Sequence, residues 1–117
     1  MKIENIKFKA KQLNSGKWFY GDLVHIGNRV CIGGDHIKDG ITDVDHYTVC
    51  QFTGLKDTND VPIFEGDIID FDGEGEVVFK DGAFYAKFGK YTECLLCNLV
   101  KSGLSVTIVG NKFDNDK

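Results

Sequence analysis

The sequence predicts a domain built mainly from antiparallel β-strands, with one short helix near its C-terminus. Fourteen glycines and a single proline among 117 residues suit short strands joined by tight turns. The hydrophobic fraction of 42%, which includes nine phenylalanines and four tyrosines, is enough to build a core. Turn signals recur at short spacing, at Asn14–Lys17, Gly27–Asn28 and Asp81–Gly82. Together these features predict one β-rich domain over residues 1–117.

The first predicted elements form a meander. Residues Ile3–Lys11 alternate between apolar side chains and lysines, which is typical of a half-buried strand with a solvated outer face. Trp18–Ile26 is the second predicted strand, with a bulge or bend at Gly21–Asp22. Arg29–Ile32 is the third, joined to the second by the two-residue turn Gly27–Asn28. We therefore expect three consecutive strands paired in order.

The segment Gly33–Asp45 has no strand pattern and is predicted to be a long polar loop. This loop and its end carry side chains that could bind a hard metal ion or act as acid–base groups, namely Asp35, His36, Asp43, Asp45 and His46. Loops are polar for solvation alone, and the sequence offers no supporting partner for these groups. We expect no stoichiometric zinc or calcium in the purified protein.

The stretch Val49–Phe71 holds the only proline and predicts a strand, a polar turn, a short edge strand and a further strand. Pro62 has no backbone N–H, so Val61–Phe64 is expected at the edge of a sheet. Gly66 allows a tight corner before the strand Asp67–Phe71.

An edge strand can pair with another chain, so this region is a candidate partner-binding edge. Its candidate residues are Ile63, Phe64, Glu65 and Asp67. An acidic rim would then select partners with basic surfaces, and its members are Asp57, Asp60, Glu65 and Asp67. An equally weighted alternative is that the same residues close the protein's own core.

The C-terminal part begins with a hairpin, in which Glu76–Lys80 and Ala83–Phe88 flank the turn Asp81–Gly82. Apolar residues recur at helical spacing in Thr92–Ser102, which predicts the only helix. Ser105–Val109 is the last predicted strand.

The formal net charge is −4, but its distribution is uneven. Residues 1–20 carry five lysines and one glutamate, whereas residues 35–76 carry twelve acids and two lysines. The acidic middle repels phosphate, so a broad nucleic-acid groove is disfavoured there. The basic first strand and a nearby aromatic ring form a candidate nucleic-acid face made of Lys7, Lys9, Lys17 and Trp18. We expect any binding to single strands to be weak and salt-sensitive.

Two further motifs resemble sites but lack necessary parts. Cys94 and Cys97 form a C-x-x-C pair, but the predicted strand before the helix is weak, and zinc would need two more ligands. The segment from Asp70 to Asp81 loosely follows a calcium loop, yet strands flank it and no glutamate stands at the twelfth position. We expect core thiols, a solvated turn, no cofactor and no catalytic residues.

No apolar run reaches the length of a membrane span, and the N-terminus lacks the apolar segment of a signal peptide. We therefore expect a cytoplasmic protein without a membrane partner, with its four cysteines as thiols.

The chain resembles the YopX-like family of small bacteriophage and prophage proteins. The matching pieces are IKFKAK (Ile6–Lys11), YGDLV (Tyr20–Val24), QFTGLKDTNDVPIFEGDIIDF (Gln51–Phe71), VVFKDGAFY (Val77–Tyr85) and VTIVGNKFDN (Val106–Asn115). The sequence departs from the family pattern at Lys11, where a tryptophan is expected, at Cys50, where a glycine is usual, and at Asp60 and Pro62 in the turn.

This resemblance implies a β-rich fold whose second half is similar to a small SH3-like barrel. With the meander that the turns predict, we expect an N-terminal lobe over about residues 1–53 and a barrel-like lobe over about residues 54–117. It also implies a phage or prophage origin and a bacterial host cytoplasm, and it carries over no catalytic residues. We expect a non-enzymatic protein-interaction module whose partner is a host or phage protein or a second copy of the chain. The alternatives are a nucleic-acid-binding SH3-like barrel using the basic first strand and a metal-dependent enzyme centred on the Asp/His loop.

Overall fold

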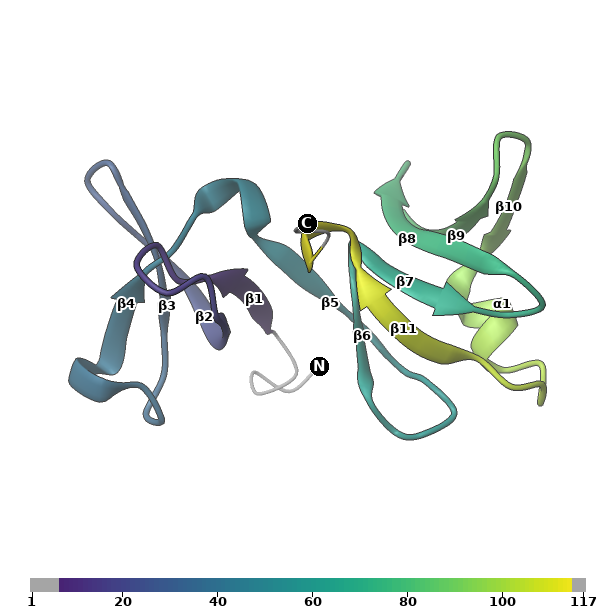
Figure 1. Cartoon of the computed structure of the whole chain (residues 1–117), viewed down its shortest axis with the longest axis horizontal. Coiled ribbons are helices and arrows are strands. Elements are labelled where there is room, and N and C mark those ends of the chain that lie inside the picture. Colours follow the sequence, from purple (N-terminus) through teal and green to yellow (C-terminus); the bar gives the residue numbers. More distant parts are fainter. Residues whose placement is uncertain (1–6, 115–117) are drawn as a thin grey trace. The chain divides into compact units, whose positions relative to one another are not determined.

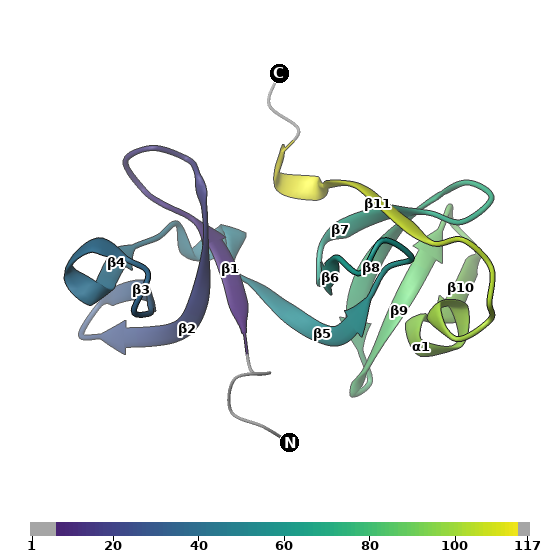
Figure 2. The same ribbon diagram turned by 90° about the horizontal axis from the view of Figure 1, so that it is seen from below.

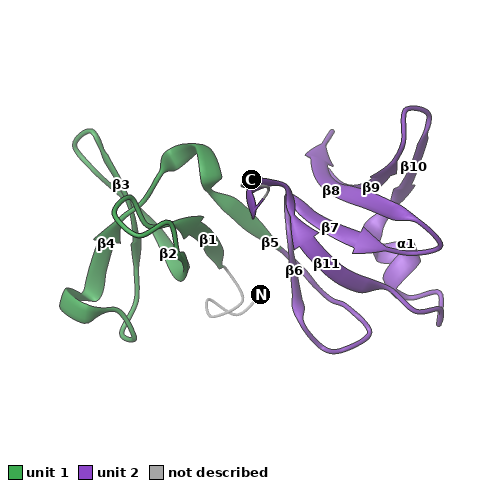
Figure 3. Ribbon diagram, viewed as in Figure 1, with its two compact units in different colours: residues 1–52 green, residues 53–117 purple. Residues whose placement is uncertain are grey.

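The computed structural model describes residues 7–114 and divides the chain into two compact units, residues 1–52 and residues 53–117 (Figures 1 and 3). The predicted fold class is confirmed, because the chain is mainly antiparallel β-structure with one short α-helix. None of the helices within residues 7–114 combines the length and the apolar character needed to cross a membrane.

The first unit is an antiparallel sheet in the order β4-β3-β2-β1-β5. Its strands are β1 (Phe8–Lys11), β2 (Trp18–Ile26), β3 (Arg29–Gly33), β4 (Ile41–Asp43) and the start of β5 (Cys50–Lys56). The predicted three-strand meander is confirmed for the described residues, and Ile3–Ile6 lie outside them. A bridge between Gln12 and Val44 also brings the chain after β4 beside the end of β1.

Two glycines occupy positions in the meander that other residues would not fill without strain or a clash. Gly27 begins the two-residue turn between β2 and β3 with a φ of 58°, a conformation that suits glycine. Gly21 lies so close to β3 that an added Cβ would sit 2.2 Å from the carbonyl oxygen of Gly33. A side chain at Gly21 would therefore push β2 away from β3.

The sequence did not predict β4, which lies inside the segment expected to be a polar loop. Pairing with β3 forms this three-residue strand, since Thr42 stands opposite Ile32. The core of the first unit draws on β1, β3 and the segments before and after β4. Its buried members are Ala10, Ile32, Ile37 and Val44, and partly buried neighbours are Phe8, Phe19, Leu23, Val30 and Val49.

The second unit contains a five-stranded antiparallel sheet in the order β10-β9-β8-β7-β11. Its elements are β6 (Pro62–Phe64), β7 (Asp67–Asp70), β8 (Glu74–Lys80), β9 (Ala83–Phe88), β10 (Thr92–Leu95), α1 (Leu96–Val100) and β11 (Thr107–Asn111). Strand β5 continues into this unit, where β6 lies beside it. The predicted hairpin turn is confirmed, because Asp81 and Gly82 have φ values of 53° and 83° between β8 and β9.

The predicted helix Thr92–Ser102 is wrong in its first turn. Residues Thr92–Leu95 form strand β10, which pairs with β9, and only Leu96–Val100 is helical. The helical spacing is real in the second half, since Leu96 and Leu99 are both buried. Pairing with β9 therefore overrides the helical pattern of the first residues. Helix α1 packs near β9 and β10 (Figure 2).

The core of the second unit is larger than that of the first. Its buried members are Ile63, Ile69, Val77, Ala86, Leu96, Leu99 and Val106. Residues from the β6 edge, the main sheet and α1 thus share one core.

Candidate functional site

The candidate partner-binding edge lies at the edge of a sheet by its backbone pairing, but its apolar side chains are buried. Strand β6 ends the sheet order beside β5, as Pro62 predicted. However, Phe64 is only 3% exposed, and Ile63 belongs to the core of the second unit. The structure thus corrects the expectation that these side chains face a partner. Ile63 fills the unit's own core and Phe64 is buried as well, in keeping with the alternative that the sequence left open.

The acidic rim expected around this edge is corrected at two of its positions. Asp67 is buried, and its Oδ2 accepts a hydrogen bond from the Phe64 N–H (2.8 Å). Its Oδ1 accepts another from the Asn111 side-chain amide (2.9 Å). Asp67 therefore ties the corner after β6 to β11 instead of facing a partner, whereas Glu65 remains half-buried.

Asp57 has a similar structural role in the loop before β6. Its Oδ1 accepts hydrogen bonds from the backbone N–H groups of Asn59 and Val61, both at 2.9 Å. Its Oδ2 accepts from the Ile108 N–H at 3.1 Å. Three backbone donors on one buried carboxylate hold the loop against β11.

The candidate nucleic-acid face is partly assembled. Lys9 stands opposite Tyr20, and Lys11 opposite Trp18, across β1 and β2. The Lys9 and Lys11 ammonium groups lie 4.6 and 5.5 Å from the centroid of the Trp18 ring. Lys9 is only 7% exposed, so its ammonium group is largely shielded from solvent beside the Trp18 ring.

The other two members of that face have different surroundings. Lys17 is exposed in the turn between β1 and β2, and Lys7 lies 5.9 Å from the Phe52 ring. The structure therefore brings Lys9 and Trp18 together, while the aromatic faces already contact the protein's own ammonium groups.

The candidate metal ligands of the Asp/His loop are separated into different contacts. His36 Nε2 lies 2.6 Å from the Tyr20 carbonyl oxygen, Asp43 pairs with Arg29, and Asp45 caps a turn. Within residues 7–114, no three histidine, cysteine, aspartate or glutamate side chains form a cluster suited to a metal ion.

The cysteine motif differs from its prediction in one respect. The sequence indicated only a weak strand before the helix, but the structure contains one. Strand β10 leads directly into α1, with Cys94 in β10 and Cys97 in α1. Both thiols are free and partly buried, whereas Cys31 and Cys50 are fully buried. The calcium-like segment Asp70–Asp81 is not a single loop, because it runs from the β7–β8 turn through the whole of β8. In that turn Asp70 Oδ1 accepts a hydrogen bond from the Gly73 N–H at 3.2 Å.

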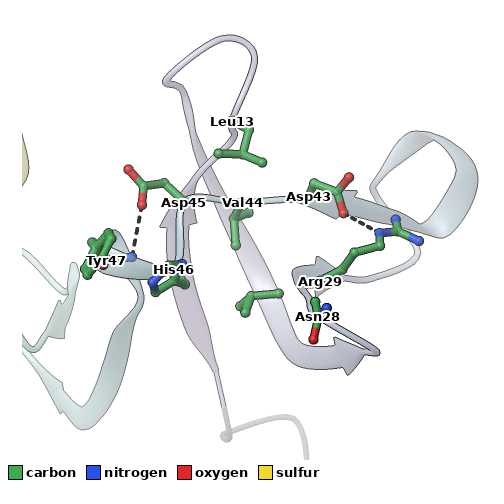
Figure 4. A pocket seen from close by; sticks show the side chains of 9 residues that line it. Leu13, Asn28, Arg29, Asp43, Val44, Asp45, His46 and Tyr47 are labelled. Atoms are coloured by element: carbon green, nitrogen blue, oxygen red, sulfur yellow. Dashed lines mark hydrogen bonds and ion pairs between the residues drawn. The ribbon is translucent and has the colours of Figure 1, made fainter.

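The first unit contains a pocket of about 490 Å³ (Figure 4). Val44 lines it between two polar ends, and Leu13 borders it from the turn after β1. Val30 is a further apolar lining residue. Its remaining lining residues are Asn28, Arg29, Asp43, Asp45, His46 and Tyr47.

Hydrogen bonds fix one wall of this pocket to β1. The wall is the short 3-10 helix η3 (His46–Thr48), which Asp45 caps by accepting the Tyr47 N–H at 3.0 Å. The buried Thr48 hydroxyl accepts from the Lys11 N–H at 2.8 Å and donates to the Asp45 carbonyl at 2.7 Å. Asp45 N–H in turn donates to the Lys11 carbonyl at 2.8 Å. Contacts within the first unit thus hold the wall against β1.

The opposite end of the pocket is an ion pair with a thiol beneath it. Arg29 Nε and Cys31 Sγ both donate to Asp43 Oδ1, at 2.9 and 3.1 Å. The hydrogen bonds from Cys31 and then from Arg29 lower the pKa of Asp43 below its ordinary value. Burial, and then the neighbouring Asp43 carboxylate, raises the pKa of the Cys31 thiol.

Large apolar surface remains open at this pocket. Leu13 is 61% exposed and Tyr47 is 76% exposed, and the rings of His46 and Tyr47 lie 4.0 Å apart between centroids. The arrangement can bind an apolar side chain between Val30, Val44 and Leu13 and a flat or cationic group on Tyr47.

Sequence reasoning found Asp43, Asp45 and His46 but assigned them to a metal. It missed Leu13 and Tyr47, although an apolar Leu13 inside a polar turn was a usable signal.

A family model described as YopX protein matches residues 7–117, which is nearly the whole chain. No curated protein matches the sequence.

Proposed function

The chain belongs to the YopX protein family, and we propose that it acts as a protein-interaction module whose first-unit pocket takes an extended segment of a partner protein. The observation that carries this proposal is the exposure of Leu13, in the turn after β1, and of Tyr47, on the wall fixed by hydrogen bonds. Fully burying a large apolar side chain contributes roughly 1.5–3 kcal/mol, so two such residues are a substantial part of a binding energy.

The form of the pocket favours a chain segment over a small molecule. Its volume of about 490 Å³ lies in the range of binding sites. A small ligand usually needs most of its surface enclosed, whereas the exposed Leu13 and Tyr47 leave this pocket open on one side. An extended segment can lie across such a groove with one side chain inserted. Because the wall is already ordered, little conformational entropy is lost there on binding.

We propose that the partner is a protein of the phage or of its bacterial host, consistent with the phage and prophage proteins that the sequence resembles. A second copy of the chain is the competing occupant. Sedimentation of the protein alone separates the two: self-association that Tyr47→Ala abolishes would assign the pocket to a second copy and overturn this proposal.

The direct test is selection of short peptides from a random displayed library on the immobilised full chain. We expect recovered peptides to lose at least tenfold in affinity on Tyr47→Ala and on Leu13→Ser. Tyr91→Ala is the matched control, since Tyr91 is 89% exposed but lies in the other unit. Peptides that bind all variants equally, or a selection that recovers none, would contradict the proposal.

A further inference from the structure

We propose that the partner segment carries a basic side chain, arginine above lysine, which pairs with Asp45 and stacks on Tyr47. This inference rests on the proposed function and specifies its partner. Three observations at one end of the pocket carry it: an open carboxylate oxygen, an imbalance of charge and an exposed ring.

The first observation is the state of the Asp45 carboxylate. Its Oδ1 accepts the Tyr47 N–H at 3.0 Å, which holds the side chain at the pocket (Figure 4). Among residues 7–114, no donor contacts its Oδ2. A carboxylate that is positioned by one oxygen and open at the other can accept a hydrogen bond from an incoming group without reorganising.

The second observation is the balance of charge around the pocket. Arg29 and Asp43 lie at the other end and neutralise each other through the 2.9 Å contact. With histidine taken as neutral at pH 7, the lining residues include no positive charge that is left to balance the Asp45 carboxylate. The nearby Lys11 directs its ammonium to Trp18, 5.5 Å from the ring centroid, and does not line the pocket. The pocket therefore carries a net negative charge at the Asp45 end.

The third observation is the ring beside that carboxylate. Tyr47 is 76% exposed, and the His46 ring lies against it with an interplanar angle of 37°. A cation over a tyrosine face is attracted by the ring, and a guanidinium can stack on it while donating to a carboxylate. An ammonium can make the same contacts only as a point charge, which is why arginine is preferred. An apolar neighbour of this residue would then meet Val30 and Val44.

The experiment uses the displayed peptides recovered on the full chain. Each peptide that requires Tyr47 is resynthesised with citrulline in place of arginine, which keeps the shape and removes the charge. We expect enrichment of arginine or lysine at one position and a loss of roughly fivefold in affinity on the change to citrulline. Raising the salt concentration should weaken the arginine peptide and leave the citrulline peptide nearly unchanged.

The matched protein variant is Asp45→Asn, because its amide oxygen can still accept the Tyr47 N–H. In this variant we expect the arginine and citrulline peptides to bind with equal affinity. Asp22→Asn, an exposed carboxylate of the same unit outside the pocket, should preserve the fivefold difference.

The possible outcomes distinguish a failure of this inference from a failure of the proposed function. Peptides that need Tyr47 and Leu13 but show no basic preference would overturn the inference and leave the interaction module standing. Equal affinity of the arginine and citrulline peptides for the native protein would do the same, and that measurement does not depend on how well Asp45→Asn folds. A selection without pocket-dependent peptides would overturn the proposed function itself.

Discussion

The turn that borders the pocket and the corner that follows β6 both place an aspartate beside apolar residues, yet they use the carboxylate in different ways. At the corner, both oxygens of the buried Asp67 accept hydrogen bonds from within the unit. At the pocket, Asp45 uses one oxygen to cap its own turn, and the other has no donor within residues 7–114. The number of donors around a carboxylate therefore separates a structural acid from a candidate binding acid, although both precede or follow turns in the sequence.

The largest expected effect comes from Phe64→Glu, which tests whether the β6 edge is core. Loss of a buried phenylalanine side chain costs about 3–5 kcal/mol, and a buried carboxylate without a partner costs several more. We expect the second unit to lose its cooperative melting transition. Val61→Glu changes an exposed side chain of the same segment and should melt like the native protein. Native-like melting of Phe64→Glu with an altered association state would instead restore the partner-binding edge.

The next effect is that of Asp67→Ala at the corner. This change leaves the Phe64 N–H and the Asn111 amide without their acceptor in a buried site. We expect a loss of about 3 kcal/mol in the free energy of unfolding, measured with urea. Asp60→Asn removes the charge of an exposed ion pair with Lys56, keeps a residue type that tolerates the φ of 67° at this position, and should change the free energy of unfolding by less than about 1 kcal/mol. Equal losses in the two variants would erase the contrast between the corner and the pocket.

A matched pair of threonine substitutions tests the same comparison with a smaller expected loss of stability. Thr48→Ala removes the hydroxyl that holds the pocket wall, and Thr58→Ala removes the hydroxyl that accepts the Val106 N–H at 2.8 Å in the second unit. Each change should lower stability by about 1 kcal/mol. Only Thr48→Ala should also weaken the selected peptides, as followed by fluorescence anisotropy. A binding loss in Thr58→Ala of the same size would mean that general destabilisation, and not the pocket wall, is being measured.

The smallest expected effect is a dependence on pH at the ion-paired end of the pocket. The pKa of Asp43 is lowered in the folded protein, first by the Cys31 thiol and then by Arg29, so its unfolded value is the higher one. Its stabilising contribution is therefore present above the unfolded pKa and disappears as the pH falls through the folded pKa. We expect Asp43→Asn to melt below the native protein at pH 7 and to match it at the acidic end of a titration. A gap that widens on acidification would contradict this assignment.

Features set by a few neighbouring residues were predictable from the sequence. The Asp81–Gly82 hairpin needs positive φ at two consecutive residues, and Gly27 provides the same freedom in the first unit. Pro62 identified an edge strand correctly because the missing N–H is a property of one residue. Burial of Ile63 was not predictable in the same way, because it depends on distant residues of β7, β8 and α1 that share its core.

The remaining differences have the same origin in distant contacts. Thr92–Leu95 carries a helical pattern, but β9 supplies backbone partners that a helix would leave unused. Strand β4 is three residues long and polar at its end, so only its pairing with β3 reveals it. The pocket combines the turn after β1, the start of β3 and the turn after β4, and no single stretch of sequence contains that combination. Sequence could name Asp43, Asp45 and His46 as unusual, but not the apolar residues that they surround.

The pairing of Trp18 with Lys9 and Lys11 gives the molecule a natural optical probe. Trp18 is the only tryptophan of the chain and lies in the first unit, with two ammonium groups near its ring. Unfolding of that unit removes those charges from the indole and exposes it to water, so its emission should shift. The second unit has tyrosines but no indole, so emission excited at the red edge of the spectrum follows the pocket-bearing half alone. A single unlabelled sample can thereby report which half melts first.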